Sequence, residues 1–252
     1  MFVNNPFTLL SEYISPAIMQ VYVILMMIAV ALGTLADLYH KRSAEFFTRR
    51  RQKAKAAAKR QLAAWEVAFL ATRTIGKEVV ISGEFCKWQR QVSHLLIMYG
   101  FLCYLVTTIL MVFVYPKAAH TPTAVTALWN IGALMVLAGA GWFFFALKVN
   151  VAYEKDSPFR LIYADLFVGS LLATVLFGLI WHLVQTAHWG RTASFVFLGF
   201  YLFFSTLLFV SVPWSKFAHM FYKPVAAFQK RLEEANGSSD LPAPAQTSNI
   251  KG

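Results

Sequence analysis

Five apolar stretches, each long enough to cross a lipid bilayer, constrain the fold of this chain more than any other feature. They run over approximately residues 18–35, 92–115, 124–147, 161–184 and 193–212 of the 252-residue sequence. A helix rises ~1.5 Å per residue, so about 20 apolar residues cross the hydrocarbon core. The composition, 58% hydrophobic and only 14% charged, is that of an integral membrane protein. We predict an all-α fold, an integral membrane bundle of five transmembrane helices.

The distribution of Lys and Arg predicts the orientation of these spans. The segment between the first two spans holds 13 of the 23 basic residues, and one further loop and the C-terminal tail bring that side to 21. The two remaining loops hold only Lys117 and Arg191. We therefore predict that the N-terminus is outside and the C-terminus cytoplasmic. The net charge of +11 is explained by a membrane face, without a nucleic acid partner.

The predicted organisation is a five-helix membrane domain over residues 1–235, which includes a cytoplasmic helical loop over 41–91, and a disordered cytoplasmic tail over 236–252. Residues 53–72 are rich in Ala and free of Gly and Pro, and Leu62, Trp65 and Phe69 share one helical face. Two interpretations stay open for this basic helix: it lies on anionic lipid headgroups, or it docks a cytoplasmic subunit. The basic residues at its start are Lys53, Lys55, Lys59 and Arg60.

Two histidines fall at the cytoplasmic boundary of the predicted membrane region. His94 lies at the start of the second span, and His219 follows the fifth span, three residues after Lys216. Because both positions are on one side, their imidazoles are expected at the same level, where two facing imidazoles can hold one haem iron axially. The two cysteines, Cys86 and Cys103, cannot hold an iron–sulfur cluster, which takes four ligands. Any cluster or flavin would therefore belong to a partner.

Further polar residues lie near both ends of the fourth span. On the outer side, the tryptophans around His182 fit an interfacial aromatic belt. Along the third and fourth spans, small residues at Gly132, Gly139, Gly141 and Gly169 fit close helix packing. Two other roles for His182 stay open: with Gln185 it can contact a quinone, or it can replace a ligand of a second haem. On the inner side, Asp165, about a turn inside the span, and His40 are rival quinone candidates. Asp165 can instead pair with a basic residue such as Arg160.

The end of the fifth span resembles that of a known cytochrome b family. The motif Pro213-Trp-Ser-Lys-Phe-Ala-His219, with Pro224 after it, is similar to the end of helix five in the nitrate reductase gamma-like family. That family includes membrane subunits of heterodisulfide-reductase-like and sulfite-reductase-associated complexes. More narrowly, residues 82–86, 94–100, 157–160, 164–166 and 212–221 resemble the membrane anchor of dissimilatory adenylylsulfate reductase in sulfur-oxidising bacteria.

The resemblance implies a function in electron transfer. His94 and His219 would be the axial ligands of a haem b, which makes them the metal ligands of this chain. In the nitrate reductase gamma pattern a second, deeper haem has ligands at two positions that are Tyr104 and Tyr201 here, so one haem is expected. Electrons would pass between quinone and a cytoplasmic flavin and iron–sulfur enzyme, adenylylsulfate reductase, at the bacterial inner membrane. The chain itself would carry no substrate chemistry.

Two alternatives stay open at this point. The partner can be a nitrate reductase or a heterodisulfide-reductase-like complex instead of adenylylsulfate reductase. The chain can also be a cofactor-free membrane scaffold or a small transporter, although few acidic and histidine residues fall at mid-depth in its spans. A visible spectrum of the purified protein distinguishes a cytochrome from a cofactor-free scaffold or transporter.

Overall fold

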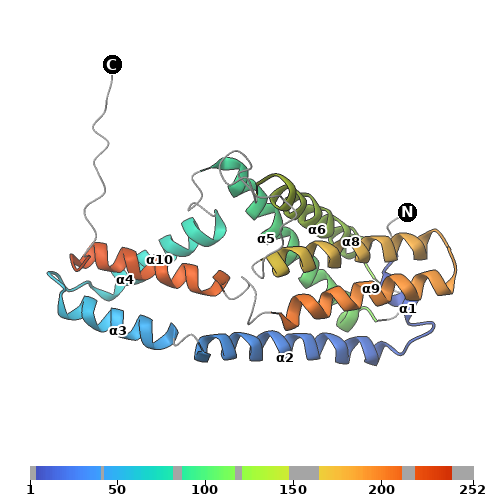
Figure 1. Ribbon diagram of the computed structural model, residues 1–252, viewed down its shortest axis with the longest axis horizontal. Helices are drawn as coiled ribbons and strands as arrows, with labels where there is room; N and C mark the ends of the chain where they lie inside the picture. The colour runs from blue at the N-terminus through green and yellow to red at the C-terminus, as the bar shows by residue number, and fades with distance from the viewer. Residues whose placement is uncertain are drawn as a thin grey trace, which may run out of the picture. The chain divides into compact units, whose positions relative to one another are not determined.

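The all-helical arrangement in Figure 1 comes from a computed structural model that describes residues 4–40, 43–81, 87–116, 121–147, 165–211 and 219–239. The chain divides into two compact units. The first, which we call the membrane bundle, comprises Met1–Asp37 and Ser82–His219. The second comprises Leu38–Ile81 and Met220–Gly252. We call it the basic unit, because its sequence contains 15 Lys and Arg against 6 Asp and Glu, a net +9.

Five helices of the membrane bundle are long and apolar enough to cross a membrane. They are Pro16–Asp37 of α2 (Pro16–His40), α5 (Trp88–Ile109) with the π-helical segment η2 (Leu110–Val114), α6 (Thr123–Trp142) with η4 (Phe143–Leu147), α8 (Leu166–Thr186) and α9 (Arg191–Val210). The prediction of five potential membrane-spanning helices is confirmed. Residues 161–164 and 212, which the predicted spans also included, lie outside the described residues.

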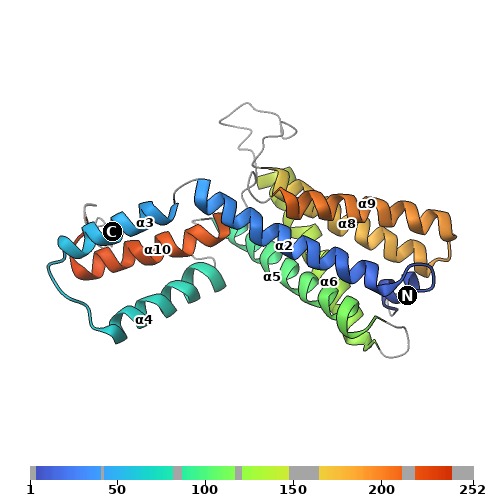
Figure 2. The ribbon, with the colours of Figure 1, turned by 90° about the horizontal axis from the view of Figure 1, so that it is seen from below.

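Glycines bring α5 and α6 together as a close antiparallel pair (Figures 1 and 2). A Cβ atom added at Gly132 would lie 2.8 Å from the backbone nitrogen of Tyr104. Seven residues along α6, the carbonyl of Gly139 accepts a 2.8 Å hydrogen bond from the hydroxyl of Ser93. The packing role predicted for Gly132 and Gly139 is therefore confirmed, since a larger residue would separate the two helices. Two glycines of the same prediction have open space beside them, namely Gly141 and Gly169.

The helices α8 and α9 form a second antiparallel pair, and α2 is joined to the bundle by fewer contacts. Phe177 of α8 stacks on Phe200 and Phe204 of α9, with ring centroids 4.9 and 5.3 Å apart. The hydroxyl of Tyr22 in α2 donates to the carbonyl of Leu202 in α9 at 3.1 Å. Much of α2 nevertheless faces outward and is apolar, as expected for a helix whose remaining surface meets lipid.

Each end of the bundle gathers a defined set of helix ends, because α5, α6, α8 and α9 alternate in direction. One end, called here the His94 end, contains the start of α5 and α8 and the end of η4 and α9. The opposite end contains the short helix α1 (Pro6–Leu10) and is called the α1 end. Asn5 caps α1 by accepting a 2.9 Å hydrogen bond from the backbone of Phe7.

The basic unit contains α3 (Ser43–Ala56), α4 (Ala64–Thr74), the π-helical segment η1 (Ile75–Val80) and most of α10 (His219–Asn236). The prediction of one continuous helix over residues 53–72 is wrong, since residues 57–63 are not helical. There the backbone N–H groups of Lys59 and Arg60 donate to the carbonyl of Asn236, at 3.0 and 3.2 Å. Contacts with the distant end of α10 thus replace the local helical hydrogen bonds.

An ion pair joins α3 to α10, which lie side by side in Figures 1 and 2. Two guanidinium nitrogens of Arg50 donate to the two carboxylate oxygens of Glu233, each at 2.7 Å. These hydrogen bonds lower the pKa of the Glu233 carboxyl, and a hydrogen bond from Gln229 adds to the effect against the opposing effect of burial. Of the tail predicted to be disordered, residues 240–252 lie outside the described residues.

Candidate functional site

The first predicted ligand, His94, lies in the second turn of α5, which neighbouring contacts hold in place. Arg90 donates to the carbonyl of Leu147 at the end of η4, at 3.4 Å, and Trp88 packs edge-on against Trp142 with ring centroids 6.1 Å apart. Both contacts join the start of α5 to the end of the α6 segment. The backbone that carries His94 is therefore fixed against its neighbour.

The imidazole of His94 projects from a particular side of α5. Ser93 is fully buried against α6, and Leu102 is 55% exposed on the opposite face. At ~100° per residue, His94 lies about midway between these two faces. It is half-buried. The side chain thus occupies neither the α6 interface nor the most exposed face, which suits a ligand directed toward a group held within the bundle.

The other predicted residues of the His94 end are described less fully. His219 is the first residue of α10 and His40 the last of α2, and their side chains lie outside the described set. Asp165 is buried, 7% exposed, and immediately precedes α8. The stretch before Asp165, where the predicted span begins, lies outside the described residues. The pairing of His94 with His219 stays a prediction.

Aromatic side chains fill the centre of the bundle. Tyr104 stacks on Trp129 with centroids 4.9 Å apart, and Tyr201 stacks on Trp181 at 5.8 Å. Gly178 lies between the two tyrosines, since a Cβ atom there would be 2.6 Å from the Tyr104 hydroxyl oxygen and 3.3 Å from the ring of Tyr201. All four aromatic residues are 5% exposed or less. These side chains occupy the interior between α5, α6, α8 and α9.

Trp181 belongs to this buried layer and not to the aromatic belt that was predicted for the outer side. It is fully buried, and its indole nitrogen donates to the hydroxyl of Ser194 at 3.2 Å. The belt interpretation therefore fails for Trp181, which is a packing residue. Trp189, at 64% exposed, has the exposure that the belt interpretation requires.

His182 is part of a buried polar contact between α6 and α8. Its ring is fully buried, its Nδ1 lies 3.1 Å from Oδ1 of Asn130, and it packs edge-on against Trp129. A buried imidazole in this setting can hold two helices in register without binding a ligand. The quinone and haem roles of His182 stay predictions.

The short helix α1, which the sequence analysis missed, joins this polar region. Gln185 donates through Nε2 to the carbonyl of Pro6 at 3.2 Å, and Asn5 donates through Nδ2 to the carbonyl of Tyr115 at 3.1 Å. Among the described residues, Oε1 of Gln185 is buried and without a hydrogen-bond partner. The signal for α1 was present in the sequence, since Asn followed by Pro is a common start of a helix.

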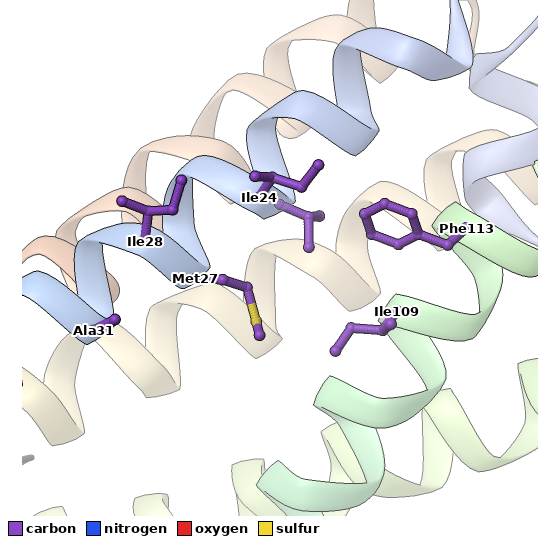
Figure 3. A pocket seen from close by; sticks show the side chains of 7 residues that line it. Ile24, Met27, Ile28, Ala31, Ile109 and Phe113 are labelled. Atoms are coloured by element: carbon purple, nitrogen blue, oxygen red, sulfur yellow. The ribbon is translucent and has the colours of Figure 1, made fainter.

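An apolar groove runs between α2 and the segment formed by α5 and η2 (Figure 3). Its volume is about 350 Å³. In Figure 3, Met27 of α2 and Ile109 and Phe113 of the opposite helix extend into the space between them. A groove of this composition suits a hydrocarbon or isoprenoid chain. The lining residues are Val23, Ile24, Met27, Ile28, Ala31, Ile109 and Phe113.

The four basic residues predicted to dock a partner lie on or just after α3. Lys53, Lys55 and Lys59 are exposed, as a docking surface requires. Arg60 is different, because its guanidinium forms an ion pair with Glu66 of α4. Three of the four are therefore positioned to present their charge to solvent.

Comparisons with known proteins add no identification. No family model matches the chain, and no curated protein or solved structure matches it.

Proposed function

We propose that this chain is a haem b-containing membrane anchor that passes electrons between a cytoplasmic oxidoreductase and membrane quinone. The observation that carries the proposal is the meeting of helix ends at the His94 end. There α5 begins, with His94 in its second turn, and α9 ends before the chain continues to His219. Support also comes from His94 itself, whose half-buried side chain lies between the α6 interface and the exposed face of α5.

His94 and His219 would hold the haem iron, and the bound haem would supply one-electron transfer. The remaining residues at this end act by positioning. The Ser93 hydroxyl bonded to Gly139 and the Arg90 guanidinium bonded to Leu147 fix the turn of α5 from which His94 projects. Rigid support of this kind sets the direction of the imidazole and limits its motion.

The aromatic layer supports one haem per chain. Tyr104 and Tyr201 stand where the resembling family has the ligands of its second haem, and both pack against Gly178. Phenols are poor substitutes for imidazoles in this role. The stacked Trp129 and Trp181 fill the space beside them.

Two features of the bundle support contact with quinone. Gln185 Oε1 is a buried acceptor without a donor among the described residues, which the hydroxyl of a quinol would supply, and His182 lies one turn earlier on α8. The groove between α2 and α5 suits an isoprenoid tail. Asp165 and His40, at the opposite end, remain the alternative quinone candidates.

The proposed partner is a soluble enzyme on the basic side of the membrane. With the N-terminus outside, the basic unit faces the cytoplasm of a bacterial cell, and Lys53, Lys55 and Lys59 attract an acidic surface. On the resemblance of its motifs, the partner is adenylylsulfate reductase, a flavin and iron–sulfur enzyme. A nitrate reductase or heterodisulfide-reductase-like complex is the alternative of the same chemical class.

The test is a visible spectrum of the purified full chain, reduced with dithionite. We expect a b-type spectrum with one haem per chain by pyridine haemochrome analysis. His94→Ala and His219→Ala should each abolish it, because either loss leaves the iron with one protein ligand. The control is His188→Asn, at an exposed position with φ of 54°, a backbone conformation that Asn tolerates.

Three outcomes would count against the proposal. A colourless wild-type protein would favour a scaffold or transporter. An intact spectrum in both histidine variants would exclude this ligand pair. Two haems per chain would contradict the role assigned to Tyr104 and Tyr201, and would make His182 a candidate ligand.

A further inference from the structure

The outward face of α4 is apolar, although α4 belongs to the basic unit. Trp65 is 71% exposed and Phe69 59%, and Ile75, the first residue of η1, is 54% exposed. At ~100° per residue, these side chains share one side of the helix with Ala68 and Thr72. A helix that met only water on this side would carry polar residues there. The outward face of α4 is therefore built to meet something less polar than water.

The other side of α4 faces the basic unit. Thr74 is 1% exposed, and its hydroxyl accepts a 3.1 Å hydrogen bond from Arg231 of α10. The neighbouring Val67 and Leu70 are half-buried. The helix thus has its internal contacts already, and the exposed aromatic residues are not a core face left open by a missing part of α4.

The charges around this face are positive. The one acidic residue of α4, Glu66, accepts hydrogen bonds from Arg60 and from the backbone of Ala63, which removes its charge from the outward surface. Arg73 is exposed at the edge of the face. Together with the net +9 of the basic unit, this favours an anionic counterpart.

The chain also ties α4 to a membrane span. The π-helical segment η1 ends at Val80, and α5 begins at Trp88. The intervening residues can extend no farther than about 25 Å. An exposed Trp and Phe on one side of a helix, basic residues at its edge and a short tether to a span are the features of helices that lie in the membrane interface.

We propose that α4 lies on the surface of a bilayer containing anionic lipids, with Trp65 and Phe69 inserted at the level of the headgroups. Arg73, at the edge of the inserted face, then lies near lipid phosphates. This role goes beyond electron transfer and does not depend on haem, quinone or the partner enzyme. It leaves the exposed lysines of α3 available to that enzyme.

Spin labels on the full chain test this placement. The native thiols are removed by Cys86→Ser and Cys103→Ala, and a label is attached to a single cysteine at Trp65→Cys or Phe69→Cys. The matched control is Lys230→Cys, whose parent side chain is 57% exposed on α10. In vesicles of phosphatidylcholine and phosphatidylglycerol, accessibility is measured to oxygen, which enters lipid, and to a nickel chelate, which stays in water.

We expect the ratio of oxygen to nickel accessibility to be several-fold higher at positions 65 and 69 than at position 230. Replacing phosphatidylglycerol by phosphatidylcholine should lower the ratio at positions 65 and 69 and leave position 230 unchanged. Equal ratios at all three positions would overturn the proposal. Exclusion of both reagents from 65 and 69 would also overturn it, because it would mean that protein covers α4. Circular dichroism and thermal unfolding of each labelled variant verify the fold.

Discussion

Within the spans of the membrane bundle the hydrogen bonds of Ser93 and Tyr22 between helices join neutral groups, whereas in the basic unit the best-defined contact joins two charges. Ser93 bonds a carbonyl of α6 and Tyr22 one of α9, while Arg50 bonds the carboxylate of Glu233. The surroundings explain the difference, since burial of a charge in hydrocarbon is costly, whereas water reaches the Arg50 side of this ion pair. The two units should therefore respond differently to substitution, pH and salt.

The largest loss of stability is expected where the backbones of α5 and α6 are in contact. Gly132→Ala places a methyl group 2.8 Å from the backbone nitrogen of Tyr104, and a backbone atom cannot move aside as a flexible side chain can. We expect a loss of about 1–3 kcal/mol in the free energy of unfolding, measured by reversible unfolding in detergent. Gly141→Ala on the same helix is the control, because its new methyl group meets nothing within 4 Å. Similar losses in both variants would mean that Gly132 is not required for the close packing of α5 on α6.

A smaller effect is expected at the ion pair of the basic unit. Glu233→Gln should loosen α3 from α10 by about 1 kcal/mol, since the Arg50 side chain is 42% exposed and solvent screens the pair. Hydrogen exchange of the amides in α3 and α10 measures this loss. The control is Glu234→Gln, whose carboxylate lies 3.9 Å from Lys230 in an exposed pair. We expect little change from it, and an equal change would show that both pairs act only through net charge.

The same ion pair gives a pH dependence with a defined sign. Because the folded state lowers the pKa of Glu233 below its usual value of 4.5, its contribution is present above pH 4.5 and is lost as the pH falls through the lowered pKa. The protection factors of the amides in α3 and α10, which correct for the intrinsic pH dependence of exchange, should therefore fall below pH 4.5 in the wild type. In Glu233→Gln this fall should be smaller, and a fall of equal size would assign it to other carboxyl groups.

The smallest effect is expected for the hydrogen bond that ties α2 to α9. Tyr22→Phe removes the hydroxyl that donates to Leu202 and keeps the ring. Interhelical hydrogen bonds in membranes contribute about 0.6 kcal/mol on average, so a loss near that value is expected in the same detergent unfolding experiment. Tyr39→Phe, at a residue 89% exposed, should change nothing measurable. A loss above about 2 kcal/mol would show that α2 depends on this one bond far more than is usual in membranes.

The spans and the glycine contacts were predictable because both depend on local sequence. A run of about 20 apolar residues has few alternatives to a spanning helix, and small residues at Gly132 and Gly139 indicate a close helix neighbour. The break after α3 was not predictable, because it depends on Asn236, far along the chain. The buried position of Trp181 was equally hidden, since sequence gives the depth of a residue in the membrane but not the direction it faces.

The contacts of α1 imply an order of assembly. Phe7 packs against Trp129 and Trp181, and the carbonyl of Pro6 accepts from Gln185, so α1 is bound by residues that are synthesised long after it. Until α8 has been made, α1 has no complete site to occupy, so it cannot dock before the four spans up to α8 are synthesised. A helix that is synthesised before all five spans is thus packed only after the fourth of them, a consequence of contacts between residues so distant in sequence.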